Sequence, residues 1–538
     1  MATRLLALPD TFPVRTAMIG AVRVAVIGHL HEHDARAAET ITAACTSNGV
    51  LRDDGAIAEA LRSLRGNFAF VMTDCENRVL AAVDKIKSYP VFVMREGTSC
   101  TIGCDARAFH STGAPSHDAV REFAMTGYVT MGETLVPELR QLRGGEALIA
   151  ESGGATRIVD YYQFAGTPRH DASFEDAVAE CAAVTRGIFE RLAQRLAGRT
   201  ALIPLSGGYD SRLVLTMLRH VGYDRIQTFS YGVPGNCEAA AARVIAERVG
   251  VPWTFVPYTR TFGRALYHTS EREQYFAFAH ERSAIPMMTD FYAFCDDARR
   301  AQLPKNAVVI NGQTGDCISG GHIPAACMAP TVTRRAFLDA ILAKHYSLWS
   351  NLRTPANDVR MEQRIIAALG GALPDAMEPS IAVQRYQEWE WRARQCEHVV
   401  RGQRVYDFFG LAWELPLWDD AYLDFWVSVP APLQYRQLLY GAMLRAYDPY
   451  GVFQAPLRRF TPPWPAAAAS VCFAAFGAQA DTMRRKYLQY WQKYAYFYAI
   501  YPYREYRRFA TDHRNPSSCL AQTVLAEYYG VQPETLLI

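Results

Sequence analysis

The segment from Ala201 to Leu215 holds an apolar run, a glycine pair, two serines and an aspartate. The glycines allow a sharp turn, and a helix starting after it presents unpaired N–H groups to an anion. Serine hydroxyls add donors, and an aspartate can hold Mg²⁺ through oxygen. A strand-to-helix turn alone needs small residues, but not both serines and the acid. We therefore predict a pyrophosphate-binding loop formed by Leu205, Ser206, Gly207, Gly208, Asp210 and Ser211.

This loop differs from the ordinary phosphate loop, which ends in Gly-Lys-Ser/Thr and uses its lysine to grip the terminal phosphates. No lysine occurs between Ala201 and Leu215. The Ser-Gly-Gly-x-Asp-Ser pattern at Ser206 to Ser211 resembles the ATP pyrophosphatases. That resemblance implies cleavage of ATP between the α and β phosphates, with AMP left on the substrate.

Strands and helices alternate around the loop. Helical periodicity extends from Phe174 to Leu196, and an apolar strand follows from Ala201 to Leu205. A second strand is predicted over Ile226 to Tyr231 and a second helix over Cys237 to Val249. Such units form parallel sheets that bind ligands at the carboxyl ends of the strands, where the loop would lie.

The chain before this region has short β-rich runs instead. They are Val22 to Ile27, Phe68 to Met72, Val79 to Val83 and Tyr89 to Val93. At 538 residues the chain exceeds what one core usually supports. We predict two domains, 1–165 and 173–538, the second becoming mostly helical after about residue 330.

Composition excludes several classes of protein. A net charge of +2 gives no overall attraction to nucleic acid or to a membrane surface. The twelve cysteines lack zinc-site spacing, and no signal peptide is evident, so a reducing cytoplasmic location is expected. The most apolar window, Ala466 to Ala480, is too short to span a bilayer and is predicted to be a packed helix.

Several ordered motifs together resemble the asparagine synthetases. The N-terminal motifs are Leu64 to Phe70, Asp74, Val79 to Asp84, Pro90 to Phe92 and Leu139 to Leu148; the later ones are Ser206 to Ser211, Phe229 to Gly232, Asn311 to Asp316 and Leu415 to Asp419. The resemblance implies an α+β Ntn-hydrolase-like sandwich of the glutaminase type. An α/β adenine-nucleotide α-hydrolase-like (PP-loop) domain with a helical C-terminal part would follow it.

The chain departs from that family at its glutaminase nucleophile. Glutamine-dependent members use a cysteine at position two, whose own amine assists it. Here the sequence reads Met1-Ala2-Thr3, and its first cysteine is Cys45. We therefore expect the N-terminal domain to keep the fold without hydrolysing glutamine, and to cover the synthetase domain or form an interface.

A second departure affects the acyl site. Gln313 stands where many family members have a glutamate, and a carboxamide is not a base near neutral pH. We expect Gln313 to line the acyl site and to act by positioning, through hydrogen bonds to the acyl-adenylate or the incoming nitrogen. The resemblance implies that Asp316 joins Asp210 as a Mg²⁺ ligand and that Ser230 and Gly312 line the nucleotide site. It also implies a late basic residue on the pyrophosphate, either Arg458 or Arg459.

The predicted activity is ATP- and Mg²⁺-dependent amide formation through an acyl-adenylate, with ammonia as the nitrogen source. Ser230 to Asn236 and His513 to Pro516 resemble family members of bacterial polysaccharide pathways, which implies a sugar-acid substrate. Aspartate is an alternative carboxylate. Other possibilities are ring closure, as in β-lactam synthetases and lasso-peptide cyclases, or a nucleotide-binding scaffold without turnover. A homodimer is possible, and neither nucleic acid nor a membrane span is expected.

Overall fold

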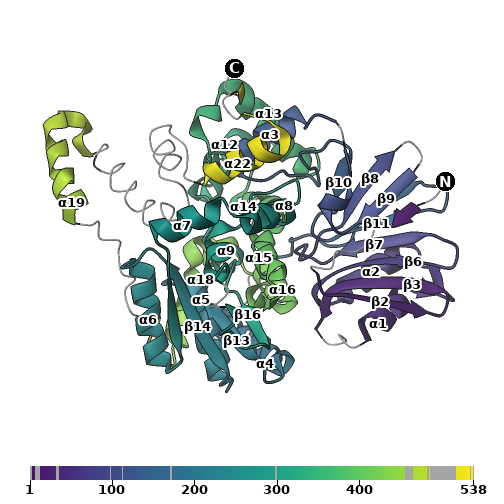
Figure 1. Cartoon of the computed structure of the whole chain (residues 1–538), viewed down its shortest axis with the longest axis horizontal. Helices are drawn as coiled ribbons and strands as arrows, with labels where there is room; N and C mark the ends of the chain where they lie inside the picture. Colours follow the sequence, from purple (N-terminus) through teal and green to yellow (C-terminus); the bar gives the residue numbers. More distant parts are fainter. Residues whose placement is uncertain are drawn as a thin grey trace.

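The computed structural model describes residues 3–5, 12–31, 36–96, 99–111, 113–169, 173–296, 300–454, 464–481, 484, 517–532 and 535–536. An N-terminal part built of antiparallel sheets lies beside a larger α/β part (Figure 1). This order confirms the predicted fold class, a sheet sandwich followed by a parallel α/β domain.

A six-stranded antiparallel sheet forms the centre of the N-terminal part. Its strands, in spatial order, are β12 (Thr156–Asp160), β11 (Glu146–Ala150), β7 (Val79–Val83), β6 (Gly66–Thr73), β3 (Val22–Leu30) and β2 (Val14–Ile19). Alternate residues of a strand face opposite sides. Phe68 and Phe70 therefore pack with helices α1 (Ala37–Cys45) and α2 (Asp54–Ser63), whereas Ala69 and Val71 join the main core on the other side.

A smaller sheet provides the second layer of the sandwich. It consists of β1 (Thr3–Leu5), β9 (Ser99–Gly103), β8 (Phe92–Glu96) and β10 (Leu139–Gln141). Ile102 of β9 belongs to the same core as Ala69 and Val71. On the opposite face, Phe92 and Leu139 pack with Phe109 and Val136 in a separate small cluster. Helix α3 (His117–Thr126) completes this part.

The α/β part contains a five-stranded parallel sheet. Its spatial order is β15 (Trp253–Pro257), β14 (Ile226–Gly232), β13 (Thr200–Pro204), β16 (Ala307–Ile310) and β19 (Ala412–Glu414). Helices α4 (Phe174–Leu196), α5 (Tyr209–His220) and α6 (Cys237–Val249) pack around it. The central strand β13 and its parallel neighbour β16 bring their carboxyl ends to one edge of the sheet.

The rest of the α/β part is helical. Its main helices are α7 (Arg260–Tyr267), α8 (Ser270–Ala279), α9 (Met288–Phe294), α11 (Gly315–Ile318), α12 (Arg334–His345), α13 (Pro355–Ala368), α14 (Pro379–Trp389), α15 (Arg404–Phe408), α16 (Asp420–Val427), α17 (Ala431–Gln434) and α18 (Leu438–Ala446). After α14 the chain continues as a π-helix, η5 (Glu390–Val399), and a 3₁₀ turn, η6 (Val400–Gln403). Fully buried tryptophans, including Trp389, Trp391 and Trp426, pack among these elements.

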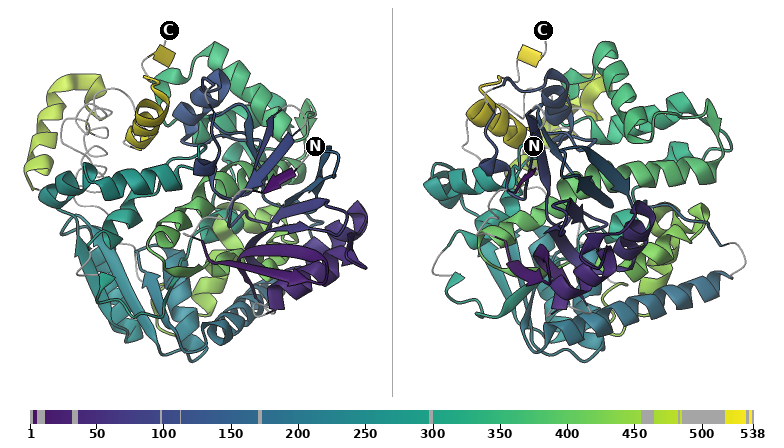
Figure 2. Two further views of the ribbon diagram at one scale, coloured as in Figure 1. Left: turned by 45° about the vertical axis from the view of Figure 1, so that its right-hand side comes forward. Right: turned by 90° about the vertical axis from the view of Figure 1, so that its right-hand side faces the viewer.

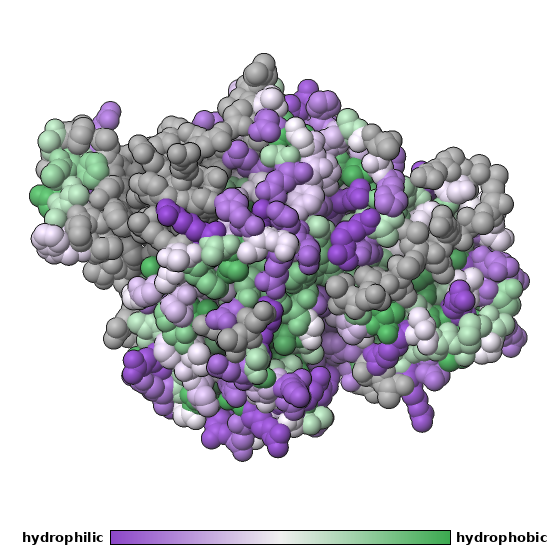
Figure 3. Space-filling view, viewed as in Figure 1, coloured by the Kyte–Doolittle hydropathy of each residue, from purple (hydrophilic) through white to green (hydrophobic). Residues whose placement is uncertain are grey.

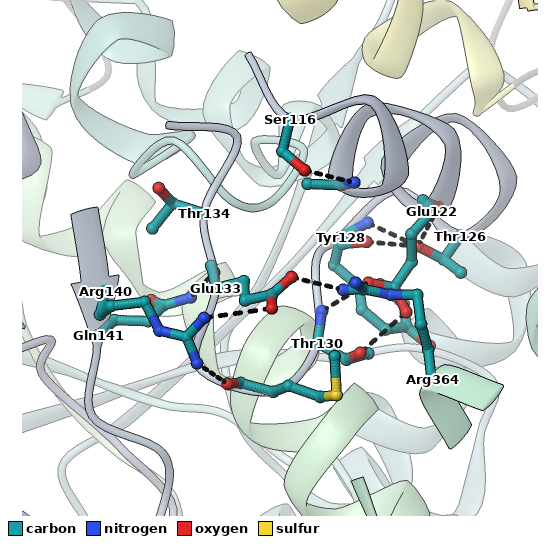
Figure 4. A network of polar contacts seen from close by, with 12 residues as sticks. Ser116, Glu122, Thr126, Tyr128, Thr130, Glu133, Thr134, Arg140, Gln141 and Arg364 are labelled. Carbon is teal, nitrogen blue, oxygen red and sulfur yellow. Dashed lines mark hydrogen bonds and ion pairs between the residues drawn. The ribbon is translucent and has the colours of Figure 1, made fainter. Parts of the chain in front are cut away.

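Ion pairs join the two parts. Lys87 Nζ contacts Glu397 Oε2 of η5 at 2.5 Å, and both side chains are about 1% exposed. Arg392 Nη2 lies 2.6 Å from Asp160 Oδ1. Figure 4 shows a third contact, in which Arg364 of α13 reaches Glu122 of α3 at 2.6 Å and Glu133 at 2.9 Å. Removing one member of the Lys87–Glu397 pair would leave a buried charge, so this contact in particular fixes the placement of the two parts.

The last described helix, α22 (Ser518–Tyr529), returns to the N-terminal part. It packs on α3, as the views in Figures 1 and 2 agree. Arg272 of α8 contacts Glu527 at 2.8 Å, and Tyr529 packs against the small cluster beside β8. Helix α22 therefore contacts elements from early and middle parts of the chain.

Two sequence predictions need correction. The strand expected from Tyr89 to Val93 begins only at Phe92, since Ile86 to Val91 form a buried turn segment before it. The window from Ala466 to Ala480 is helical, as α19 (Trp464–Val471) and η9 (Cys472–Gln479), but it is not packed as expected. Trp464 is 81% exposed and Val471 is 70% exposed.

The surface mixes polar and apolar residues. On the face drawn in Figure 3, hydrophilic and hydrophobic side chains are interspersed over both parts of the molecule. Within the described ranges, no helix has the length and apolar content needed to cross a membrane.

Candidate functional site

The predicted pyrophosphate loop connects β13 to α5. The backbone N–H of Ser206 donates to Ser211 Oγ at 3.0 Å, and that of Gly208 donates to Ser206 Oγ at 3.1 Å. The two hydroxyl oxygens lie 3.0 Å apart. Gly208, at the N-cap, has no side chain to cap α5, so the first-turn N–H groups and the helix dipole favour an anion there.

A second loop, from Asn311 to Thr314 after β16, lies directly against the start of α5. A Cβ added at Gly312 would be 2.9 Å from the backbone of Asp210 and Ser211. A Cβ at Gly315 would be 2.4 Å from Asp210 Oδ1. Both positions therefore require glycine for the two loops to approach. Contact of Gly312 with a bound nucleotide stays a prediction.

The two predicted metal ligands meet where these loops touch. Asp210 accepts hydrogen bonds from the backbone N–H of Asp316 at 3.0 Å and from the hydroxyl of Tyr440 at 2.9 Å. Burial, together with the negative charge of Asp316, raises the pKa of Asp210 to about 7. The Asp316 side chain is 55% exposed, so it faces solvent. Paired carboxylates of this kind suit a hard cation such as Mg²⁺, which would relieve their repulsion.

A histidine that sequence reasoning did not select completes this acidic group. His322 Nε2 lies 3.0 Å from Asp316 Oδ2, and its Nδ1 contacts the buried Glu390. Burial would lower the pKa of His322, but the hydrogen bonds to both carboxylates raise it to about 9. The imidazole is therefore positively charged at neutral pH. A lone histidine six positions after Asp316 gave no motif by which the sequence could reveal it.

Gln313 is hydrogen-bonded to two other carboxamide side chains, those of Gln403 and Asn311. Its Oε1 accepts a hydrogen bond from Gln403 Nε2 at 2.8 Å, and its backbone N–H donates to Asn311 Oδ1 at 3.0 Å. Within the described structure, the buried Oε1 of Gln403 has no hydrogen-bond partner. An unpaired buried acceptor costs free energy, which a bound N–H donor would recover. Gln403 was not selected from the sequence.

Ser230 supports the loop from behind. Its hydroxyl donates to the carbonyl of Leu205 at 2.6 Å and accepts from Trp253 Nε1 at 2.9 Å. These bonds tie β14 and β15 to the exit of β13. The hydroxyl and the Leu205 carbonyl are thus engaged with each other in this structure, so contact of either with nucleotide remains a prediction.

Arg458 and Arg459, the predicted pyrophosphate arginines, lie outside the described residues. A different arginine touches the loop. Arg212, which is 1% exposed, donates to the carbonyls of Gly207 and Val452. These two hydrogen bonds hold the pyrophosphate loop against the segment that follows α18. Arg212 therefore stabilises the conformation of the loop.

The profile of the family described as "Asparagine synthase" matches residues 193–461, which is half of the chain and includes both loops, Tyr440 and His322. No curated protein matched in a sequence search.

Two solved structures were among the structural matches. Glutamine phosphoribosylpyrophosphate amidotransferase from B. subtilis, complexed with ADP and GMP, shares 11% identity over 46% of this chain and 73% of its own, with a TM-score of 0.20. A structure titled the allosteric regulatory enzyme of purine biosynthesis shares 12% identity over 55% of this chain and 56% of its own, with a TM-score of 0.19. Scores this low carry no inference about this chain.

Proposed function

Because the chain belongs to the asparagine synthase family, we propose that it uses ATP to activate a substrate carboxylate and then joins the acyl group to ammonia. The observation that carries the proposal is the meeting of two loops at the carboxyl ends of β13 and β16. One loop offers N–H groups and hydroxyls to pyrophosphate, and the other places Asp316 beside Asp210.

The first step is adenylation. A carboxylate oxygen of the substrate bonds to the α-phosphorus of ATP, and the bond from that phosphorus to the β-phosphate oxygen breaks. Pyrophosphate leaves into the N–H groups at the start of α5, with Ser206 and Ser211 as further donors. These fixed dipoles stabilise the charge that develops on the leaving group.

Mg²⁺ fits the residues present. Asp210 and Asp316 would hold it through oxygen, and it would neutralise phosphate charge. The elevated pKa of Asp210 supports this assignment. Burial and the negative charge of Asp316 disfavour the ionised form of Asp210, and a bound cation would stabilise that form. Tyr440 orients that carboxylate through its 2.9 Å hydrogen bond.

The second step is transfer of the acyl group to nitrogen. Ammonia attacks the acyl carbon, the carbon–oxygen bond to phosphate breaks, and AMP leaves with the original carboxylate oxygen. The buried, unpaired Oε1 of Gln403, next to Gln313, would accept an N–H of the nucleophile. Neither carboxamide is a base, so the AMP phosphate takes the released proton.

Ammonia is proposed because the thiols of the sandwich are unsuited to glutamine hydrolysis. Burial raises the pKa of Cys45 to about 12 and that of Cys104 to about 12, and it also raises the pKa of Cys100. Cys75 is exposed but lies within the chain, without the terminal amine of the family's nucleophile. The proposed substrate is a sugar acid or aspartate, supported by the sequence resemblance alone.

The test is transfer of oxygen from a labelled carboxylate. The full-length protein is incubated with ATP, Mg²⁺, ammonium and ¹⁸O-carboxylates, namely aspartate, uronic acids and nucleotide-linked uronic acids. With one of these acids, we expect the protein to release pyrophosphate and to form AMP that carries one ¹⁸O atom from the carboxylate. Asp224→Asn, at an exposed acid of the same domain, is the matched control for Asp210→Asn and should keep full activity.

Each other outcome has a meaning. ADP as the product, or AMP without label, would overturn adenylation of the carboxylate. Label in AMP without any need for ammonium would favour ring closure of a substrate that carries its own amine. Tight ATP binding with no product from any acid or peptide would favour the alternative that the protein is a nucleotide-binding scaffold without turnover.

A further inference from the structure

Two histidines of the N-terminal sandwich face a glutamate of the α/β part. His29 lies near the end of β3, and His31 directly follows the last residue of that strand, Leu30. Glu414 ends β19, the edge strand of the parallel sheet. His29 Nε2 is 3.2 Å from Glu414 Oε1, and His31 Nε2 is 3.9 Å from Glu414 Oε2.

The two imidazole Nε2 atoms are enclosed, whereas the Glu414 carboxylate is already hydrogen-bonded to Arg195. The Nε2 atoms of His29 and His31 are buried and have no hydrogen-bond partner among the described residues. Glu414 is 5% exposed and also meets Arg195 of α4 at 3.1 Å.

We propose that His29, His31 and Glu414 bind a divalent transition metal ion of the zinc class, which ties the two parts of the molecule together. Two imidazoles and one carboxylate form a donor set that zinc accepts and that Mg²⁺, which prefers oxygen, does not. Tetrahedral coordination at Zn–N distances of about 2.0–2.1 Å sets donor atoms roughly 3.3 Å apart. The observed separations of 3.2 and 3.9 Å need only small side-chain shifts.

The surroundings leave room for a fourth ligand. A cavity of about 840 Å³ is lined by all three side chains together with Arg195, Arg199 and Trp413. Three protein ligands leave a position that water or a small anion can occupy. Arg195 remains an outer partner of the Glu414 carboxylate, and such partners orient a metal ligand.

Cobalt is the probe, because Co²⁺ takes the same ligands and has visible absorption. Full-length protein is stripped with a chelator, kept in excess Mg²⁺ and titrated with Co²⁺. The expected result is one equivalent bound, with the intense visible bands of four-coordinate cobalt. Sulfur-to-cobalt charge transfer should be absent, because the site has no thiolate. Zn²⁺ should displace the cobalt, as its affinity is higher.

Variants assign the site. His29→Asn and His31→Asn should each weaken Co²⁺ binding by more than about 100-fold, beyond the 10–100-fold typical of losing an outer-shell partner. His110→Asn, at an exposed histidine of the same sandwich, is the matched control and should bind as the wild type does. Zn²⁺ should raise the unfolding temperature of the wild type and of the control, but not of His31→Asn.

If a variant fails to fold, X-ray absorption spectroscopy of the cobalt-loaded wild-type protein identifies the cobalt ligands directly. Two imidazole ligands and no sulfur would support the site. No four-coordinate spectrum, a sulfur ligand, or unchanged binding in folded His29→Asn and His31→Asn would each overturn it. The proposal stands apart from the ligase activity, since none of these readouts depends on turnover.

Discussion

Two groups of buried charges in this molecule are balanced in different ways. At the nucleotide site, Asp210 faces Asp316, and among the described residues no side-chain cation pairs with Asp210. At the junction of the two parts, by contrast, three cations meet three acids. These are Lys87, Arg401, Arg404, Glu281, Glu397 and Asp407, each 5% exposed or less.

The difference separates binding from architecture. Within the described part of the chain, the buried Asp210 carboxylate has no cationic partner of this kind, which is costly until a cation arrives, so it indicates a place for a ligand. In the junction cluster the numbers of cations and acids are equal, so the formal charges cancel and an added ion is not needed for charge balance. Only the nucleotide site, and not the junction cluster, should be stabilised by Mg²⁺. The following predictions test this contrast.

Asp210→Asn should reduce pyrophosphate formation by more than about 10³-fold, because it removes a Mg²⁺ ligand where charge develops. The same change should not destabilise the protein. The folded pKa of about 7 exceeds the unfolded value of 3.8, so the stability that this group gives at low pH is lost as pH rises through 7.

At pH 8 without Mg²⁺, the Asp210→Asn variant should therefore melt roughly 2–4 °C higher than the wild type. Added Mg²⁺ should raise the melting temperature of the wild type only. A variant that melts lower than the wild type in calorimetry, with or without the metal, would contradict the idea of an uncompensated Asp210 carboxylate.

Lys87→Met should destabilise the protein by about 3–5 kcal/mol, because it leaves Glu397 buried without its 2.5 Å partner. Urea unfolding measures the loss. The double variant Lys87→Met with Glu397→Leu should recover most of it, since both charges are then gone. If the double variant is as unstable as the single one, packing rather than charge balance explains the effect.

Gly312→Ala should lower the rate of pyrophosphate formation by about 100-fold. The added methyl would lie 2.9 Å from the backbone of Asp210 and Ser211, so the second loop must move. Misplacing catalytic groups by about 1 Å can lower a rate by about 100-fold. Gly187→Ala, within α4 and without such a contact, is the control and should leave the rate unchanged. Equal rates for both variants would mean that the loops need not touch.

His322→Gln should give the smallest effect, a gain of about fivefold in apparent Mg²⁺ affinity at pH 7.5. It removes a positive charge worth ~1 kcal/mol beside Asp316. In the wild type, affinity should rise as pH passes the His322 pKa of about 9, and the variant should lack that rise. Mg²⁺ titrations of pyrophosphate release at several pH values make this comparison, and parallel pH curves would refute it.

Local patterns predicted much of the fold. Helix α4 runs from Phe174 to Leu196 and α6 from Cys237 to Val249, as their periodicity indicated. Strand β7 likewise matches Val79 to Val83. The misplaced start of β8 arose because the apolar, buried segment before Phe92 has strand-like composition without strand pairing.

The site was predictable where its residues are close in sequence or follow a strand. Asp210 and Asp316 do meet, as the parallel sheet requires. Tyr440, Glu390 and Gln403 were missed because each approaches from a helix far along the chain, and a single tyrosine, glutamate or glutamine carries no local pattern. Only tertiary packing gives these side chains their roles.

The placement of α22 has a consequence for synthesis of the chain on the ribosome. Its partner α3 ends at Thr126, whereas α22 ends at Tyr529. At 5–20 residues per second, about 20–80 s separate the emergence of these two helices. During that interval the nascent sandwich lacks part of its native cover, so chaperones have a defined surface and a defined time in which to act.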